Sequence, residues 1–193
     1  GADNRSNRQC LYLSNHLSYA DIFVIGGIRD LVFISKDDVR SWPVFGYLAT
    51  LQKTVFIPRS RAGIEIAKTR ILERMKQGYD LILFPEGTST DGTEVKPFKR
   101  ALVPFDLDID IQPVAIAITH VDGQRATTQA QRDRYAWYGD MDFLPHLWGL
   151  FCGRSVRVAV HFLPIINAAD FADEGALVNH AYQAVHTELG EGA

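Results

Sequence analysis

His16 and Asp21 are the two residues of this sequence whose types and spacing suggest chemistry most directly. They stand five positions apart in the segment NHLSYAD, where a predicted strand ends and a predicted helix begins, so the two side chains can meet. A carboxylate that bonds one imidazole nitrogen orients the ring and stabilises its cation. The other nitrogen can then take a proton from an alcohol. Acyl transfer to a hydroxyl needs this step, because an unactivated alcohol attacks a thioester slowly.

Two further groups of polar residues follow predicted strands. Arg59 comes directly after the stretch VFIP and before a predicted helix, where a guanidinium can bind a phosphate through two hydrogen bonds. The helix N-terminus would add N–H donors and positive potential. Glu86, Gly87 and Thr88 follow the run DLILFP, and their carboxylate, flexible backbone and hydroxyl can bind a polyol. We expect such loops to cluster at the carboxyl ends of the strands.

Each of these groups also has an alternative interpretation. Ser18 and Asp21 have the spacing of a capping box, so Asp21 could simply serve a helix N-terminus. Arg59 could be a surface arginine, and residues 86–88 could form an ordinary turn. Cys10 or Ser18 could act as the nucleophile of a thioesterase or lipase, although the apolar strand around Cys10 favours a place in the core. A lipid-binding module without catalysis is the last alternative.

Strands and helices alternate along the chain around these groups. Apolar runs predict strands at residues 10–14, 31–35, 54–57, 80–84, 111–118 and 154–163. Helices are predicted at residues 20–28, 43–52, 62–76 and 176–189, and the helix at 62–76 has one apolar face and ends at Gly78. The alternation predicts an α/β fold with a mixed, partly parallel sheet flanked by helices, in a single domain spanning residues 1–193.

Two apolar segments have more than one place in such a fold. Pro113, within the run IQPVAIAI, predicts an edge strand or an interruption, because proline cannot donate to a strand ladder. The segment 143–153, FLPHLWGLFCG, contains no Asp, Glu, Lys or Arg. It is too short to span a membrane. Of the core and a membrane interface we favour the core for this segment.

Composition excludes several classes of protein. Apolar residues make up 47% and charged residues 22% of the chain, which excludes a disordered chain. The segment 36–76 is rich in Lys and Arg, so it either attracts phosphates or anionic membranes or forms a solvated helix face. Cys10 and Cys152 lack the spacing of a disulfide framework or zinc site and fit a reducing location. There is no nucleotide-binding glycine loop, G-x-S-x-G elbow or H-E-x-x-H motif.

The order of the motifs resembles that of the glycerolipid acyltransferase family. The patterns H-x4-D, F-I-x-R, F-P-E-G-T and a proline-bearing apolar strand follow one another within residues 11–164. The stretches FPEGTSTDG, PFKRAL and WYGDMDFLPHLW are similar to bacterial 1-acyl-sn-glycerol-3-phosphate acyltransferases. Two residues depart from the family pattern. Pro58 replaces an acidic or polar residue, and Arg100 replaces a common glycine, which bears on the acceptor more than on the chemistry.

The resemblance implies a role for each matching residue. His16 would be the general base and Asp21 its orienting partner. The acceptor site would be formed by Arg59, which would bind the phosphate, and by Glu86, Gly87 and Thr88, which would line it.

The resemblance also implies substrates and a location. A fatty acyl chain would move from acyl-CoA or acyl carrier protein to 1-acyl-sn-glycerol-3-phosphate, giving phosphatidic acid, with no metal or cofactor. Alternative acceptors are a lyso-ornithine lipid, another lysophospholipid and glycerol-3-phosphate. Family members associate with membranes. We therefore expect a membrane surface as partner, at the cytoplasmic face of a bacterial inner membrane, with an anchor upstream of this sequence and no nucleic-acid partner.

Overall fold

The computed structural model describes residues 9–37, 40, 54–57, 60–105 and 109–191. The predicted helix at 43–52 and the predicted phosphate ligand Arg59 lie outside these residues. The strands are β1 (Cys10–Ser14), β2 (Val32–Lys36), β3 (Val55–Ile57), β4 (Leu81–Leu83), β5 (Asp110–Val121), β6 (Gln124–Arg125), β7 (Val156–Phe162) and β8 (Ile166–Asn167). The helices are α1 (Asp21–Gly26), α3 (Arg61–Lys76), α4 (Gln129–Arg132), α5 (Phe143–Cys152) and α6 (Glu174–Glu191), with a 3-10 turn at Ala168–Asp170.

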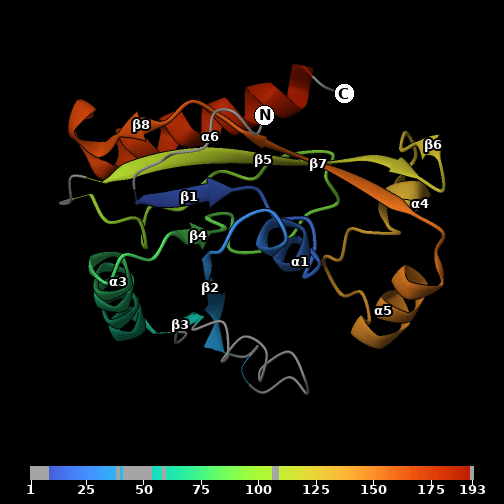
Figure 1. The fold of residues 1–193 in the computed structure, drawn as a ribbon, viewed down its shortest axis with the longest axis horizontal. Coiled ribbons are helices and arrows are strands. Elements are labelled where there is room, and N and C mark those ends of the chain that lie inside the picture. Colours follow the sequence, from blue (N-terminus) through green and yellow to red (C-terminus); the bar gives the residue numbers. More distant parts are fainter. Residues whose placement is uncertain (1–8, 38–39, 41–53, 58–59, 106–108, 192–193) are drawn as a thin grey trace.

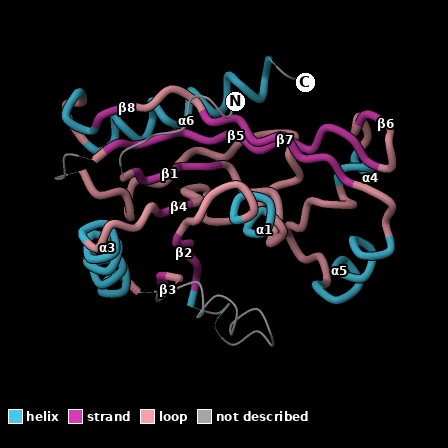
Figure 2. The backbone as a smooth tube through the Cα atoms, in the orientation of Figure 1, coloured by secondary structure: helices cyan, strands magenta, loops and turns pink. Residues whose placement is uncertain are grey.

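The strands form one mixed sheet (Figures 1 and 2). Its order is β3-β2-β4-β1-β5-β6, and β7 and β8 also pair with β5. The pairs β2–β3, β2–β4, β1–β4 and β1–β5 are parallel, whereas β6, β7 and β8 run antiparallel to β5. The predicted mixed, partly parallel sheet with flanking helices is confirmed. Because β1 and β4 are parallel neighbours, the loops that follow them leave the sheet at the same edge.

The central strand β1 is buried on both faces. Leu11 and Leu13 belong to an apolar cluster that includes residues of α3 and α6, whereas Cys10 and Tyr12 belong to a second cluster that includes α1. Alternate residues of a strand point to opposite faces, so a continuous apolar run suits a strand with helices on both sides. This packing fixes Ser14, where the strand ends and the next loop begins.

Helix α3 has the predicted apolar face. Ala67, Ile71 and Met75 are buried against the first cluster. The helix begins one residue earlier than predicted, after Ser60, whose side-chain oxygen accepts the N–H of Gly63 at 2.9 Å. Glycine at position 78 has φ +89°, which suits the left-handed end of a helix. The helix thereby covers the sheet on the side away from α1.

Pro113 lies inside the sheet, since β5 pairs with β1 on one side and with β7 and β8 on the other. The prediction of an edge strand is therefore wrong. The strand itself continues through Pro113, and only its pairing on one side is interrupted there. The pairing of β5 with β7 begins at Val114 and that with β8 ends at Ile111. The Pro113 carbonyl accepts the N–H of Leu163 at 3.0 Å, so the side of Pro113 that lacks a donor faces the gap between the two partner strands.

Helix α5 packs against the core with one face only. The prediction that segment 143–153 lies in the core is therefore wrong for the other face. Phe143, Leu147 and Leu150 pack against the second cluster. Leu144, Trp148 and Phe151 lie on the other face and are 72%, 72% and 76% exposed. Among the described residues, no helix combines the length and the hydropathy of a membrane span.

Candidate active site

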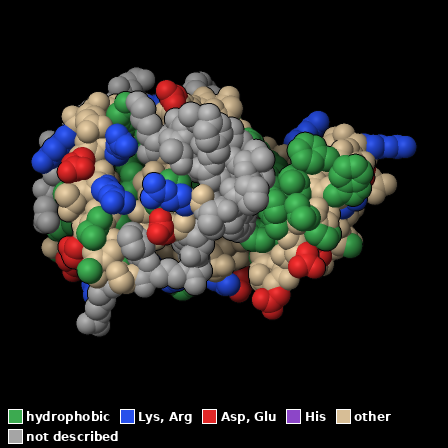
Figure 3. Space-filling model, turned by 90° about the horizontal axis from the view of Figure 1, so that it is seen from below, with side chains coloured by type: hydrophobic (Ala, Val, Ile, Leu, Met, Phe, Trp, Pro, Cys, Tyr) green, Lys and Arg blue, Asp and Glu red, His purple; other side chains and the backbone are tan. Residues whose placement is uncertain are grey.

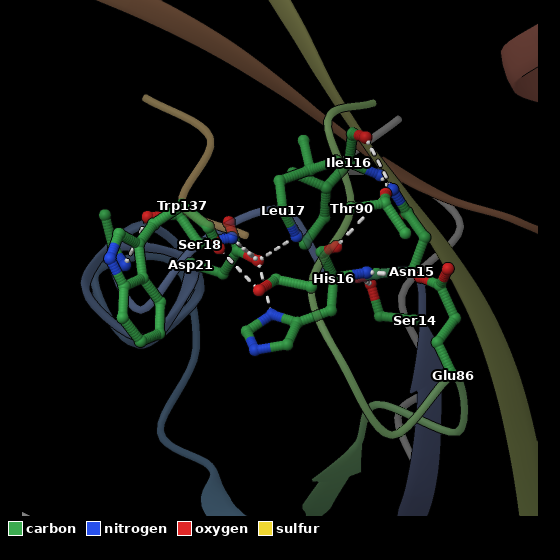
Figure 4. Close-up of polar contacts among 12 residues, drawn as sticks. Ser14, Asn15, His16, Leu17, Ser18, Asp21, Glu86, Thr90, Ile116 and Trp137 are labelled. Atoms are coloured by element: carbon green, nitrogen blue, oxygen red, sulfur yellow. Dashed lines mark hydrogen bonds and ion pairs between the residues drawn. The ribbon is translucent and has the colours of Figure 1, made fainter. Parts of the chain in front are cut away.

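His16 and Asp21 are in direct contact in the loop between β1 and α1 (Figure 4). His16 Nδ1 lies 2.7 Å from Asp21 Oδ2, and the same oxygen accepts the backbone N–H groups of Leu17 at 2.8 Å and Ser18 at 3.1 Å. The Asp21 side chain is fully buried, whereas 22% of the His16 side chain is exposed. The carboxylate thus holds both the imidazole and the loop that carries it, and the imidazole keeps access to solvent.

The capping-box interpretation of Asp21 holds in part, because Asp21 Oδ2 accepts the backbone N–H of Ser18 as the last residue of such a box does. The N-cap of α1 is Ala20, and no side chain caps it. Ser18 uses its hydroxyl oxygen to accept the N–H of Ala20, two residues on, at 3.2 Å. Asp21 therefore serves the turn that leads into α1 and, through the same oxygen, also holds His16 and the N–H of Leu17.

The second oxygen of Asp21 is bonded by a residue far away in the sequence. Tyr135, which is 3% exposed, donates its hydroxyl to Asp21 Oδ1 at 2.8 Å. Burial, and after it the charge of Asp21, raises the pKa of the Tyr135 phenol far above its ordinary value, so the group stays protonated and donates. Sequence reasoning missed Tyr135, since a lone tyrosine after α4 matches no motif.

The ring of His16 is also fixed by stacking. It lies on the Phe84 ring with a centroid distance of 4.2 Å and an angle of 19° between the planes. Its Nδ1 is occupied by Asp21, and no residue of the described part of the chain hydrogen-bonds its Nε2. The ring is therefore oriented with one nitrogen available for a substrate.

Glu86 joins the loop after β4 to the loop after β1. It is 1% exposed, and its Oε1 accepts the N–H of His16 at 2.7 Å while its Oε2 accepts the N–H of Lys96 at 2.8 Å. Burial raises the pKa of the Glu86 carboxyl, and the two backbone bonds act in the opposite direction. Both oxygens are engaged by the protein, so the contact with an acceptor that we predicted for Glu86 stays a prediction.

The other predicted acceptor residues lie in the same turn. Gly87 has φ +72°, and a Cβ at this position would stand 3.0 Å from Lys99 Nζ, so glycine suits both the backbone and the close approach of the lysine. Thr88 is exposed. Thr90 donates its N–H to the His16 carbonyl at 2.9 Å, which ties this turn to the histidine loop. The acceptor roles of Gly87 and Thr88 stay predictions.

Asn15 holds the start of the histidine loop against β5. Its side-chain NH2 donates to the Ile116 carbonyl at 2.9 Å, and its side-chain oxygen accepts the Ile116 N–H at 2.8 Å. These bonds continue the parallel ladder of β1 and β5 beyond Ser14, the last residue of β1. The main chain before His16 is therefore fixed as firmly as a strand.

The alternative nucleophiles are poorly placed. Cys10 and Ser18 are both fully buried. Burial, and after it the charges of Asp80 and Asp110, raises the pKa of the Cys10 thiol far above its ordinary value, which disfavours the reactive thiolate. Among the described residues, no group of His, Cys, Asp and Glu has the arrangement of a metal site. The geometry favours His16 as a base over a covalent mechanism.

Comparison with known proteins adds sequence and fold relatives. Residues 1–117 match the family model described as Acyltransferase. The lyso-ornithine lipid O-acyltransferase of Brucella abortus (strain 2308) is 40% identical over 162 residues, which cover 79% of this chain and 60% of that protein. The 1-acyl-sn-glycerol-3-phosphate acyltransferase of Neisseria gonorrhoeae is 28% identical over 186 residues, which cover 95% of this chain and 70% of that protein.

A solved structure shares the fold. The crystal structure of the 1-acyl-sn-glycerophosphate (LPA) acyltransferase, PlsC, from Thermotoga maritima superimposes with a TM-score of 0.68 at 22% identity, over 99% of this chain and 69% of that one. The chain spans about 60% of the length of the lyso-ornithine lipid O-acyltransferases that it matches.

Proposed function

The chain belongs to the acyltransferase family, and from this premise we propose that it transfers a fatty acyl chain from a thioester donor to the hydroxyl of a lyso-lipid. The observation that carries the proposal is the contact of His16 Nδ1 with the buried carboxylate of Asp21, at 2.7 Å, on a side chain that is 22% exposed. The donor is acyl-CoA or acyl carrier protein, as the family resemblance implied.

The proposed reaction is a direct transfer without an acyl-enzyme. Neutral His16 removes the proton of the acceptor hydroxyl through Nε2, and Asp21 stabilises the imidazolium that forms. The acceptor oxygen bonds to the thioester carbonyl carbon, the carbon–sulfur bond breaks, and His16 returns the proton to the leaving thiolate. The products are the acylated lipid and the free thiol of the donor.

For the acceptor we propose a lyso-ornithine lipid first and 1-acyl-sn-glycerol-3-phosphate second. Relatives named for the former are 34% to 40% identical to this chain, against 28% for the bacterial relatives named for the latter. This order reverses the preference that the motif resemblance gave, because motifs that serve the shared chemistry do not distinguish the acceptors. Arg59, the predicted phosphate ligand, would in that case bind the acceptor's carboxylate.

An acceptor panel tests this order. Purified protein is given acyl-CoA or acylated carrier protein with lyso-ornithine lipid, 1-acyl-sn-glycerol-3-phosphate or glycerol-3-phosphate, and products are identified by mass spectrometry. We expect the acylated ornithine lipid to form about tenfold faster or more than phosphatidic acid, because a pocket with fixed polar groups discriminates strongly between head groups. Faster formation of phosphatidic acid would make 1-acyl-sn-glycerol-3-phosphate the preferred acceptor. Lysophosphatidylethanolamine completes the panel, and transfer to none of the four would reject the proposed function.

The exposed face of α5 suits a lipid surface, which the proposed substrates require. Figure 3 shows hydrophobic side chains gathered on this part of the molecule, with Lys and Arg along one border and Asp and Glu along the other. Trp148 and Phe151 are exposed on this face, and the exposed Arg154 follows the helix, as expected of a helix that lies on an anionic bilayer. Tyr19, within the histidine loop, packs on Phe143 with a ring distance of 4.9 Å, so a membrane under α5 would lie beside the site. The location proposed is the cytoplasmic face of the inner membrane.

A vesicle experiment tests this surface. Replacing Trp148 and Phe151 with serine is expected to weaken binding to phosphatidylglycerol-containing vesicles by about tenfold or more, since two large apolar side chains are lost from the interface. Ile66→Ser on α3, where Ile66 is 46% exposed, is the matched control. Flotation measures binding, and turnover of a short-chain soluble acceptor should be unchanged. Unaltered flotation of the double variant, or equal loss in the control, would reject this surface.

A further inference from the structure

Tyr135 is joined to the histidine and aspartate across a long separation in sequence. It lies 114 residues from Asp21, yet its hydroxyl bonds Asp21 Oδ1 at 2.8 Å inside the second apolar cluster. Among the described residues, Tyr135 is the donor to Asp21 Oδ1, whereas Oδ2 is bonded by three groups of the histidine loop. The two oxygens of the carboxylate are thus divided between the loop that carries His16 and a distant segment.

We propose that Tyr135 is a positioning residue, which fixes the plane of the Asp21 carboxylate so that Oδ2 points at His16 Nδ1. This inference rests on the proposed function. Three donors already hold Oδ2, and the donor on Oδ1 is the one that fixes the opposite side of the carboxylate plane. It narrows the remaining torsional motion about the Cβ–Cγ bond and compensates part of the buried charge. Tyr135 acts only through Asp21 and needs no contact with substrate.

The position of Tyr135 is itself set by the segment around it. Its N–H donates to the Arg132 carbonyl at 2.9 Å, directly after α4, which a capping box at Thr128 begins. Two residues later, Trp137 donates its N–H to the carbonyl of Leu17 at 2.9 Å. The segment is therefore bonded to the histidine loop by main chain as well as by the tyrosine hydroxyl. A rigid segment of this kind can orient a carboxylate.

Tyr135→Phe tests the proposal, because it removes the hydroxyl and keeps the ring. We expect kcat to fall about tenfold, the size of a lost hydrogen bond to a charged group, with the KM of both substrates unchanged. The NMR signal of the His16 Nδ1 proton should shift. Tyr138→Phe is the matched control, since the Tyr138 hydroxyl bonds Asp133 at 3.0 Å in the same segment. A kcat within twofold of wild type together with an unshifted signal would overturn the inference.

A double variant separates positioning from a general structural role. In a His16→Ala background, removal of the Tyr135 hydroxyl should leave the residual rate unchanged, because no imidazole remains to be oriented. A further tenfold loss there would mean that Tyr135 supports the fold instead. The His16 proton signal can be measured without turnover. If wild type shows no acyl transfer, the proposed function fails, and the signal in Tyr135→Phe still decides whether the tyrosine orients the pair.

Discussion

His16→Ala is expected to lower kcat for acyl transfer by about 10²–10⁴-fold, because the reaction loses its general base. KM should change little, since the imidazole is proposed to accept the hydroxyl proton in the transition state and not to bind the lipid. Stability should be nearly kept, because the backbone N–H of His16, which bonds Glu86 at 2.7 Å, is present in alanine as well. Single-turnover and steady-state assays with purified protein measure the loss.

The histidine on α6 at position 186 supplies a control for this variant. His186 is exposed, its ring lies 5.6 Å from that of Tyr182, and it has no contact with the His16 loop among the described interactions. His186→Ala should keep wild-type turnover. If the His16 variant, folded by circular dichroism, turned over at a near wild-type rate, the base mechanism would be wrong.

The sequence predicted the parts of the site that depend on local pattern. β1 and β4 could be recognised because each is a short apolar run that ends at a polar turn, and parallel packing then brings the two turns to one edge. The contact of His16 with Asp21 follows from their spacing across a strand-to-helix turn. The helix at 62–76 was predictable for the same reason, since one apolar face and a terminal glycine are local signals.

Long-range partners could not be predicted in the same way. The bond from Tyr135 to Asp21 depends on how the segment after α4 returns over the second cluster, and a single sequence carries no signal for that return. Glu86 was predicted to line an acceptor site, yet its two oxygens accept backbone N–H groups of His16 and Lys96. These bonds depend on how the two loops pack together, which the sequence does not show. The exposed face of α5 has the composition of a core, and composition alone cannot tell a core from a surface that binds lipid.

Asp21→Asn is expected to lower kcat by about 10²–10⁴-fold while the protein stays folded. The amide oxygen can take the place of Oδ2 and accept from His16, Leu17 and Ser18, but it cannot stabilise an imidazolium as a carboxylate does. The amide NH2 would then face Tyr135, whose hydroxyl can rotate from donor to acceptor. We therefore expect the fold to be kept in Asp21→Asn and the rate of acyl transfer to fall.

Glu86→Gln is the matched carboxylate-to-amide variant, and it should behave differently. Both partners of Glu86 are backbone N–H groups, which cannot become acceptors, so one buried donor would face the amide NH2. That should cost about 1–3 kcal/mol of unfolding free energy. Urea denaturation and kcat measured on both variants distinguish the cases. A marked loss of stability in Asp21→Asn, or near wild-type kcat in that variant, would show that the charge of Asp21 serves the fold and not the imidazole.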